Sequence, residues 1–228
     1  MNTFITILRN IRAPLMRIIH PMKGYFLFPA TSPLSHKYGF DRGTPIDRYY
    51  IDQFLNAHRQ YIQGVCLEIE DTTYIKRYGG AAVTHSDALD INPTNKHATI
   101  YGDLRHLTDV KDNTYDCIVL TQTLTMIDDY TAALQECARI LKPGGSLIAT
   151  VSSLCPMIHV ERSYWRFTVA SMKYILAKYF STVEVRSYGN VLSGQAFWVG
   201  AAAEELSREN LDVVDPRYPV LIGFRVTR

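Results

Sequence analysis

Polar side chains that could grip a small ligand stand at the ends of several short apolar runs of the sequence. Glu70, Asp90, Asp103 and Gln122 each lie at or just after the end of such a run. Carboxylates accept hydrogen bonds from hydroxyl and amino groups, and an amide both donates and accepts them. Ligands of open parallel α/β sheets bind outside the carboxyl ends of the strands, so we expect these residues to form one binding site.

The elements that must position these residues alternate along the chain. The expected strands are 65–69, either 81–84 or 88–91, 98–101, 115–120 and 146–151. The expected helices run from Thr44 to Gly64, from Asp128 or Asp129 to about Leu141, and onward from the cap Thr168. A strand at 183–186, a helix around 193–207 and a closing strand at 220–226 follow. This order predicts an α/β fold, a Rossmann-like doubly wound sheet that is mostly parallel, with an antiparallel C-terminal edge strand and helices on both faces.

The composition indicates one large globular domain and limits its partners. The chain has 228 residues, of which 47% are hydrophobic and 20% are charged, and its formal net charge is +2. A balance so near neutral disfavours a nucleic-acid partner. The histidines and acidic residues form no clustered ligand pattern, so no metal is expected. Cys66, Cys117, Cys137 and Cys155 have neither C-x-x-C nor zinc spacing, which indicates buried thiols in a reducing cytoplasm. The oligomeric state, a homodimer included, is left open.

The N-terminal segment 1–43 is predicted to cover the main domain, 44–228. Apolar residues from Phe4 to Ile18 recur at helical spacing with arginines between them. No run of 18 apolar residues and no cleavage site for a secretory signal occur in the chain. Packing of this helix on protein is favoured over membrane-surface binding, which stays the alternative. Residues 21–43 are expected to form an ordered irregular link.

Three stretches in the middle of the chain resemble class I S-adenosylmethionine-dependent methyltransferases. They are Asp103-Leu104, the strand around Tyr115-Asp116-Cys117-Ile118, and Leu141-Lys142-Pro143-Gly144-Gly145. The acid after the third strand, the D-x-I strand and the LKPGG turn occur in this order and spacing across that family, and the resemblance covers roughly residues 44–151. The chain also resembles a subgroup associated with bacterial glycan and natural-product pathways, through the segments RGTPIDRYYI (42–51), YWRFT (164–168) and YGNVL (188–192).

The resemblance implies a binding site for S-adenosylmethionine, with S-adenosylhomocysteine as the product. Asp103 would take the adenine amino group, and Leu104 would pack on the ring. Asp90 or, in another register, Asn92 would hydrogen-bond the ribose hydroxyls. The implied donor-binding residues are Glu68, Ile69 and Glu70 beside the amino-acid end, Asp90, Asn92, Asp103 and Leu104, and Thr121 and Gln122 near the sulfonium.

The first loop departs from the family, which has a glycine-rich turn directly after the first strand. Here Glu70-Asp71-Thr72-Thr73-Tyr74 occupies that place, and Gly79-Gly80 come late. A variant cradle for the donor is one interpretation. A methyltransferase-fold protein that has lost catalysis and acts as a binding or scaffold partner is the other. A nicotinamide-dependent oxidoreductase ranks last, because its G-x-G-x-x-G turn is absent.

Methyl transfer needs a nucleophile that is held close and in line, and a hydroxyl nucleophile also needs a base. His159 and Tyr164 are the catalytic candidates. The substrate-binding candidates are Arg42, Arg48, Tyr49, Trp165 and Arg166. A surface histidine, an aromatic core cluster and solvated helix-end arginines are the plainer interpretations of the same residues. The leading hypothesis is a methyltransferase that modifies a small molecule or glycan, at oxygen.

Overall fold

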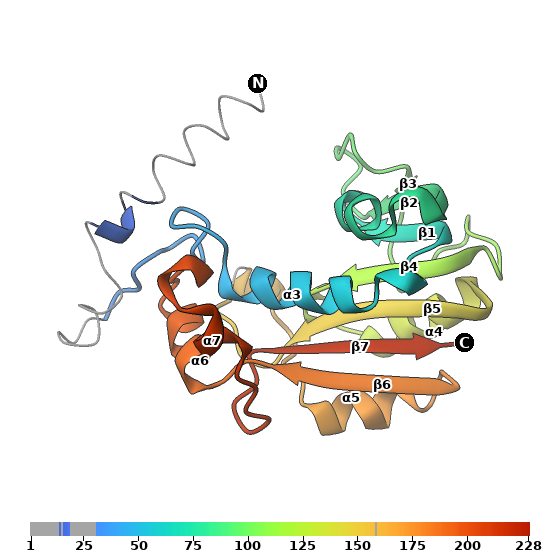
Figure 1. The fold of residues 1–228 in the computed structure, drawn as a ribbon. Helices are drawn as coiled ribbons and strands as arrows, with labels where there is room; N and C mark the ends of the chain where they lie inside the picture. The colour runs from blue at the N-terminus through green and yellow to red at the C-terminus, as the bar shows by residue number, and fades with distance from the viewer. Residues whose placement is uncertain (1–13, 15, 19–30, 158) are drawn as a thin grey trace. The chain divides into compact units, whose positions relative to one another are not determined.

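The computed structural model describes residues 14, 16–18, 31–157 and 159–228 (Figure 1). Most of the predicted N-terminal helix therefore lies outside the described residues. The larger helices are α3 (Ile46–Ala57), α4 (Tyr130–Ile140), α5 (Val169–Leu176), α6 (Val191–Trp198) and α7 (Arg208–Asp212). The strands are β1 (Gly64–Ile69), β2 (Val83–Asp90), β3 (Ile100–Tyr101), β4 (Tyr115–Thr121), β5 (Leu141–Ser152), β6 (Thr182–Tyr188) and β7 (Leu221–Thr227). No helix within the described ranges combines the length and the apolar character needed to cross a bilayer.

The chain divides into two compact units. The first unit contains residues 1–50, 154–156 and 187–221, and the remaining residues form the second unit. The second unit contains β1 to β5, the helices α4 and α5, and all four residues singled out at the ends of the apolar runs.

One seven-stranded sheet has the order β3-β2-β1-β4-β5-β7-β6. The pairs β1–β2, β2–β3, β1–β4 and β4–β5 are all parallel. The chain runs outward from β1 through β2 to β3 and then returns to β4 on the other side of β1. The strand order thus reverses between β1 and β4, and the carboxyl ends around this switch point are where a ligand crevice is expected.

The last strand, β7, runs antiparallel to its neighbours. The amide of Gly144 donates to the carbonyl of Arg228 at 3.2 Å, and the amide of Arg228 donates back to Gly145 at 3.1 Å. On the other side, Ser181 donates to Thr227 at 2.9 Å. The predicted fold class is confirmed. The C-terminal strand β7, which was expected at the edge of the sheet, lies one place in from the edge, between β5 and β6.

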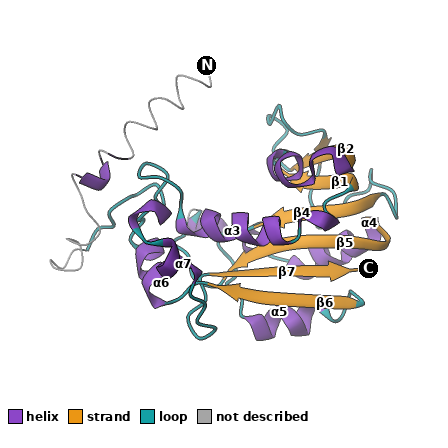
Figure 2. Cartoon of the chain, in the orientation of Figure 1, coloured by secondary structure: helices purple, strands orange, loops and turns teal. Residues whose placement is uncertain are grey.

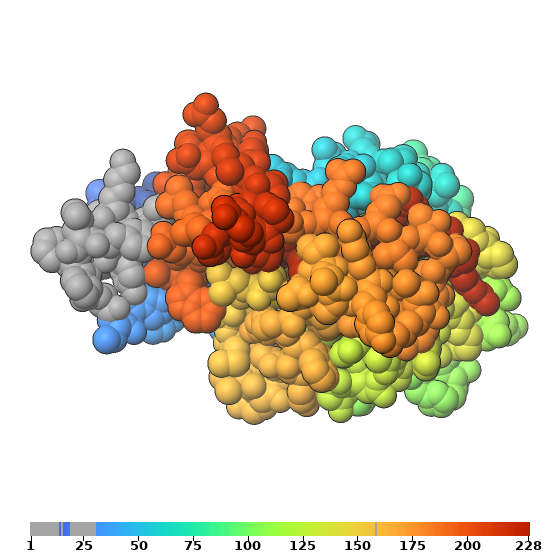
Figure 3. All heavy atoms as spheres, turned by 90° about the horizontal axis from the view of Figure 1, so that it is seen from below, coloured from blue at the N-terminus to red at the C-terminus, as the bar shows by residue number. Residues whose placement is uncertain are grey.

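Helices cover both faces of the central strands. Cys117 to Leu120 of β4 are fully buried, as the continuous apolar run predicts for a strand covered on both sides. Residues of α4 and α5, among them Leu134 and Met172, pack in one core cluster with one face of the sheet. Phe54 of α3 lies against Gly223. Figure 2 shows α3 on the side of the sheet opposite to α4 and α5. In the space-filling view, the orange residues of α5 and β6 lie beside the yellow-green α4 region (Figure 3).

Several of the predicted elements differ from the observed ones. The α-helix predicted from Thr44 to Gly64 ends at Ala57, and β5 begins at Leu141 instead of 146. The alternatives 81–84 and 88–91 are parts of a single strand, β2. The single helix predicted around 193–207 is wrong in its second half, because α6 ends at Trp198 and a separate short turn spans Ala203–Glu205. Gly200, whose φ is 75°, takes a left-handed conformation that breaks the helix between them. The predicted cap Thr168 is confirmed, and of the two predicted aspartates Asp129 caps α4.

The glycine pair before the apolar part of β5 provides a stability test. A Cβ on Gly145 would lie 2.9 Å from the carbonyl oxygen of Lys142 and 3.1 Å from that of Tyr115. We expect Gly145→Ala to lower the free energy of unfolding by about 1–3 kcal/mol in urea titrations, because backbone atoms must move. Gly144 has a φ of 81° and open space around it, so Gly144→Asn should cost about 1 kcal/mol or less. Equal losses in the two variants would contradict this steric explanation.

Candidate functional site

The carboxyl ends of β1, β2, β3 and β4 lie side by side and form what we call the donor rim: residues 68–74, 90–95, 103–106 and 121–128. The register of the strands aligns these ends. Glu68 of β1 pairs with Ala88 of β2 and with Val119 of β4, and Asp90 of β2 pairs with Tyr101 of β3. The predicted donor-site residues are thus brought to one edge of the second unit.

The loop after β1 is organised around the buried carboxylate of Glu68. Its two oxygens accept the backbone N–H groups of Tyr74, at 3.1 Å, and Ile75, at 2.9 Å. These N–H groups open the helical turn Ile75–Gly79, the place where dinucleotide-binding folds hold a pyrophosphate. The chain's own carboxylate occupies that position, which adds a structural argument against a nicotinamide dinucleotide.

Burial also changes the acidity of Glu68. The side chain is 4% exposed, and desolvation raises its pKa from 4.5 to about 7, against the opposing effect of the two N–H donors.

The turn directly after β1 keeps a glycine-like conformation without a glycine. Glu70 has a φ of 69°, in the left-handed region, and the amide of Asp71 donates to the carbonyl of Ile69 at 2.9 Å. The side-chain amide of Asn95 donates to the carbonyl of Glu70 at 2.7 Å and holds the turn in place. A left-handed conformation costs a residue with a side chain about 1–2 kcal/mol, which the surrounding contacts must offset.

Asp90 is the last residue of β2 and links two segments of the rim. Its Oδ2 accepts from Asn95 Nδ2 at 2.7 Å, and its Oδ1 accepts the N–H of Asn92 at 2.8 Å. The side-chain oxygen of Asn92 instead accepts the N–H and the hydroxyl of Thr94. Asp90 is therefore the residue that ends the strand, whereas Asn92 lies in the turn that follows it.

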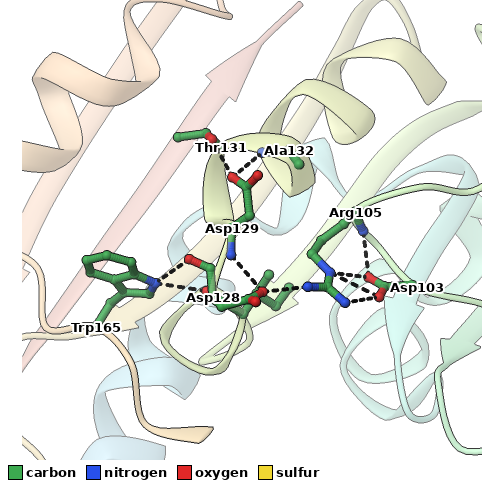
Figure 4. Close-up of polar contacts among 8 residues, drawn as sticks. Asp103, Arg105, Asp128, Asp129, Thr131, Ala132 and Trp165 are labelled. Atoms are coloured by element: carbon green, nitrogen blue, oxygen red, sulfur yellow. Dashed lines mark hydrogen bonds and ion pairs between the residues drawn. The ribbon is translucent and has the colours of Figure 1, made fainter.

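Arg105 clamps Asp103 after β3 (Figure 4). Arg105 Nε lies 3.0 Å from both carboxylate oxygens of Asp103, and its backbone N–H donates to Oδ1 at 2.9 Å. Its Nη1 reaches across to Asp128 Oδ1 at 2.6 Å. The hydrogen bonds from Arg105 lower the pKa of Asp103. Leu104 is buried in the hydrophobic core cluster of the second unit.

The segment after β5 is fastened to the loop after β4. Trp165 Nε1 donates to the carbonyls of Ile127, at 2.9 Å, and Asp128, at 3.0 Å (Figure 4). Its ring packs edge-on against Tyr130. The N–H groups of Tyr164 and Trp165 both donate to the carbonyl of Thr125. Tyr164 and Trp165 thus stand beside the donor rim, with 51% and 38% of their surfaces exposed.

Gln122, directly after β4, carries a side-chain N–H donor that no residue in the described part of the chain accepts. Its φ is 58°, its N–H donates to the carbonyl of Thr150 at 2.8 Å, and its Oε1 accepts the hydroxyl of Ser152 at 2.7 Å. Its Nε2 is buried and has no hydrogen-bond partner among the described residues. A buried amide donor without a partner is costly, so a ligand or water at this place would be stabilising. Thr121 is the half-buried last residue of β4.

The remaining predicted residues lie at the end of β1 and in the segment after β5. His159 is exposed directly before the short turn Val160–Arg162, and Arg166 donates to the carbonyl of Trp165 at 2.8 Å. Ile69 is the half-buried end of β1.

Three predicted substrate residues belong to the first unit. The guanidinium of Arg42 is fully buried and pairs with Glu205, with Nε–Oε1 and Nη2–Oε2 distances of 2.9 and 2.7 Å. This contact stabilises the unit internally and gives no support to a substrate clamp at Arg42. Arg48 pairs with its neighbour Asp47 at 3.0 Å, and the hydroxyl of Tyr49 donates to Asp212 at 2.6 Å.

Two residues of the rim were missed by sequence reasoning: Asn95 and Arg105. Only Arg105 had a visible signal, its position two residues after Asp103. Within the described part of the chain, no cluster of three His, Cys, Asp or Glu side chains could hold a metal ion. All four cysteines are free thiols, three of them buried.

Comparisons with known proteins agree with this architecture. Residues 66–149 match the family model described as "Methyltransferase domain". Demethylmenaquinone methyltransferase of Bacillus pumilus (strain SAFR-032) is 31% identical over 78 residues. That match covers 34% of this chain and 31% of the relative, so the chain spans under a third of the relative's length.

Solved structures show the same fold. A SAM dependent methyltransferase from Archaeoglobus fulgidus superposes with a TM-score of 0.54 at 14% identity, over 79% of this chain and 94% of that chain. Phosphoethanolamine N-methyltransferase 2 of Haemonchus contortus, in complex with S-adenosyl-L-methionine, superposes with a TM-score of 0.55 at 13% identity. This match covers 87% of the present chain and 54% of that chain. The described chain therefore has the Rossmann-like fold of S-adenosylmethionine-dependent methyltransferases.

Proposed function

We propose that this protein is an S-adenosylmethionine-dependent methyltransferase that modifies a small molecule or glycan at an oxygen atom. The observation that carries the proposal is the meeting of Glu68, Asp90, Asp103 and Gln122 at one carboxyl edge of a sheet with the methyltransferase strand order. The match of residues 66–149 to a methyltransferase domain supports it, since these residues include the whole rim.

The side chains at the donor rim fit the chemistry of the proposed donor. Asp103 and Asp90 are acceptors for an amino group and for hydroxyls, and Gln122 offers a buried N–H that no described residue accepts. Bound S-adenosylmethionine would supply an electrophilic methyl group on its sulfonium. The protein's part is to bind and orient it and to keep water from the reacting atoms.

The proposed acceptor faces the segment after β5. Tyr164 and Trp165 expose aromatic surface beside the rim, and Met126 adds an apolar side chain that is 37% exposed. Such surfaces suit a sugar or another ring, and Arg166 could pair with an anionic substituent. We assign Tyr164 and His159 as the groups that take the proton of an attacking hydroxyl. One relative is named for demethylmenaquinone, which is compatible with a small-molecule acceptor.

Calorimetry tests the donor part of the proposal. S-adenosylmethionine and S-adenosylhomocysteine should bind the wild-type chain, whereas NAD should not, because Glu68 occupies the N–H groups that a pyrophosphate would need. Mass spectrometry and NMR of a methylated acceptor would then separate attachment at oxygen from attachment at carbon or nitrogen.

A second candidate is a binding or scaffold partner without catalysis. It is favoured by the first loop, which lacks glycine, and by the carboxylates of Asp90 and Asp103, which already have partners within the chain. Absence of donor binding at millimolar concentration would support this candidate and overturn the methyltransferase.

A further inference from the structure

We infer that Arg105 is a positioning residue of the donor rim, which orients the Asp103 carboxylate so that the rim selects a purine with an amino group. The inference rests on the proposed function. It concerns Arg105, an exposed residue outside the donor-binding set that the family resemblance implies.

The hydrogen bonds of Asp103 leave room for one more donor. A carboxylate offers about four lone-pair sites. Three N–H groups of Arg105 fill most of them: the backbone N–H on Oδ1, Nη2 on Oδ2, and Nε between the two oxygens. About one site remains, which matches one N–H of an exocyclic amino group. Arg105 thus orients the carboxylate and still leaves one of its lone-pair sites open to a ligand.

Arg105 itself is held at its far end. Its Nη1 contacts Asp128 Oδ1 at 2.6 Å, and the same oxygen accepts the N–H of Asp129 at 2.8 Å (Figure 4). Asp129 in turn caps α4 by accepting the N–H of Ala132 at 3.0 Å. An isolated exposed ion pair contributes little, but a fork fixed between two carboxylates holds a defined geometry. The orientation of Asp103 is therefore set by the start of α4.

The chemical consequence is selectivity at the purine ring. A carboxylate that stays ionised accepts hydrogen bonds and donates none. It pairs with the amino group of adenine and repels the carbonyl oxygen of hypoxanthine. Arg105 fixes the direction in which the free lone pair of Asp103 points, so its loss should relax the discrimination between the two bases.

The test compares two ligands by calorimetry: S-adenosylhomocysteine and S-inosylhomocysteine, which has a carbonyl oxygen in place of the amino group. Wild-type protein should bind the adenosyl ligand about tenfold tighter or more. Arg105→Gln should weaken the adenosyl ligand about five- to tenfold and leave the inosyl ligand nearly unchanged. Arg105→Lys should recover part of the loss, and Asp128→Asn should cost about two- to threefold on the adenosyl ligand alone.

The chain offers a matched control. Arg217 forks onto Asp215, two residues earlier, with backbone and Nε distances of 3.0 Å, the same local motif as Arg105 with Asp103. Arg217→Gln should change neither affinity. Equal weakening of both ligands by Arg105→Gln, in protein with an unchanged melting curve, would overturn the inference while donor binding stands. Failure of the wild-type chain to bind S-adenosylhomocysteine would overturn the proposed function and this inference with it.

Discussion

Replacing Asp103 by alanine is expected to weaken the binding of S-adenosylhomocysteine by about 1–3 kcal/mol, or roughly 5- to 150-fold. The carboxylate lies after β3, where the strand order directs it to the donor rim, and Arg105 fixes its orientation. Its removal would take away the acceptor proposed for the adenine amino group. Calorimetry measures the loss directly.

Asp109 provides the control for this prediction, because it is an exposed aspartate of the same connection between β3 and β4. Asp109→Ala removes the same charge and should leave the affinity unchanged. An Asp103→Ala protein that binds as tightly as the wild type would remove Asp103 from the site.

Glu68 should make the stability of the fold depend on pH in an unusual direction. Its folded-state pKa of about 7 lies above the ordinary value of 4.5, because burial penalises the charge. The folded state therefore holds a proton that the unfolded chain has already lost. The stabilising contribution is fully present below pH 4.5 and disappears as the pH rises through 7, with a total on the order of 3 kcal/mol.

Glu68→Gln removes this titration. Relative to the wild type, its free energy of unfolding should rise by about 3 kcal/mol between pH 4.5 and 8 in urea titrations. Glu136→Gln is the matched opposite, since Arg139 lowers the pKa of Glu136 and its contribution is lost as the pH falls. A constant difference between wild type and Glu68→Gln across this range would refute the buried-carboxylate explanation.

The local patterns predicted the second unit well. The continuous apolar run of β4 and the inner face of α4 depend on burial and helical spacing, which can be read from neighbouring residues. The rim followed from them, because strand ends fix where Asp90 and Asp103 lie.

What the sequence could not show depends on contacts between distant residues or on unusual backbone. The partner of Arg42, Glu205, lies 163 positions away in the sequence. Arg42 was therefore predicted to bind substrate, whereas it forms a buried ion pair. The left-handed φ values of Glu70 and Gln122 are rare for residues with side chains, and neither glutamate nor glutamine indicates such a conformation in a sequence. The place of β7 between β5 and β6 is a choice of strand partner, which periodicity does not encode.

That position of β7 has a consequence for biosynthesis. In chain order β6 is made before β7, yet β7 is the neighbour that joins β6 to the rest of the sheet. While the ribosome is still adding residues 189–220, β5 and β6 both have open edges facing a gap that only later residues can fill. Parallel β1 to β5 can pair early, but the sheet closes only after translation has passed residue 227. A nascent chain stalled before that point would expose two unpaired strand edges, the kind of surface that chaperones shield and that promotes aggregation.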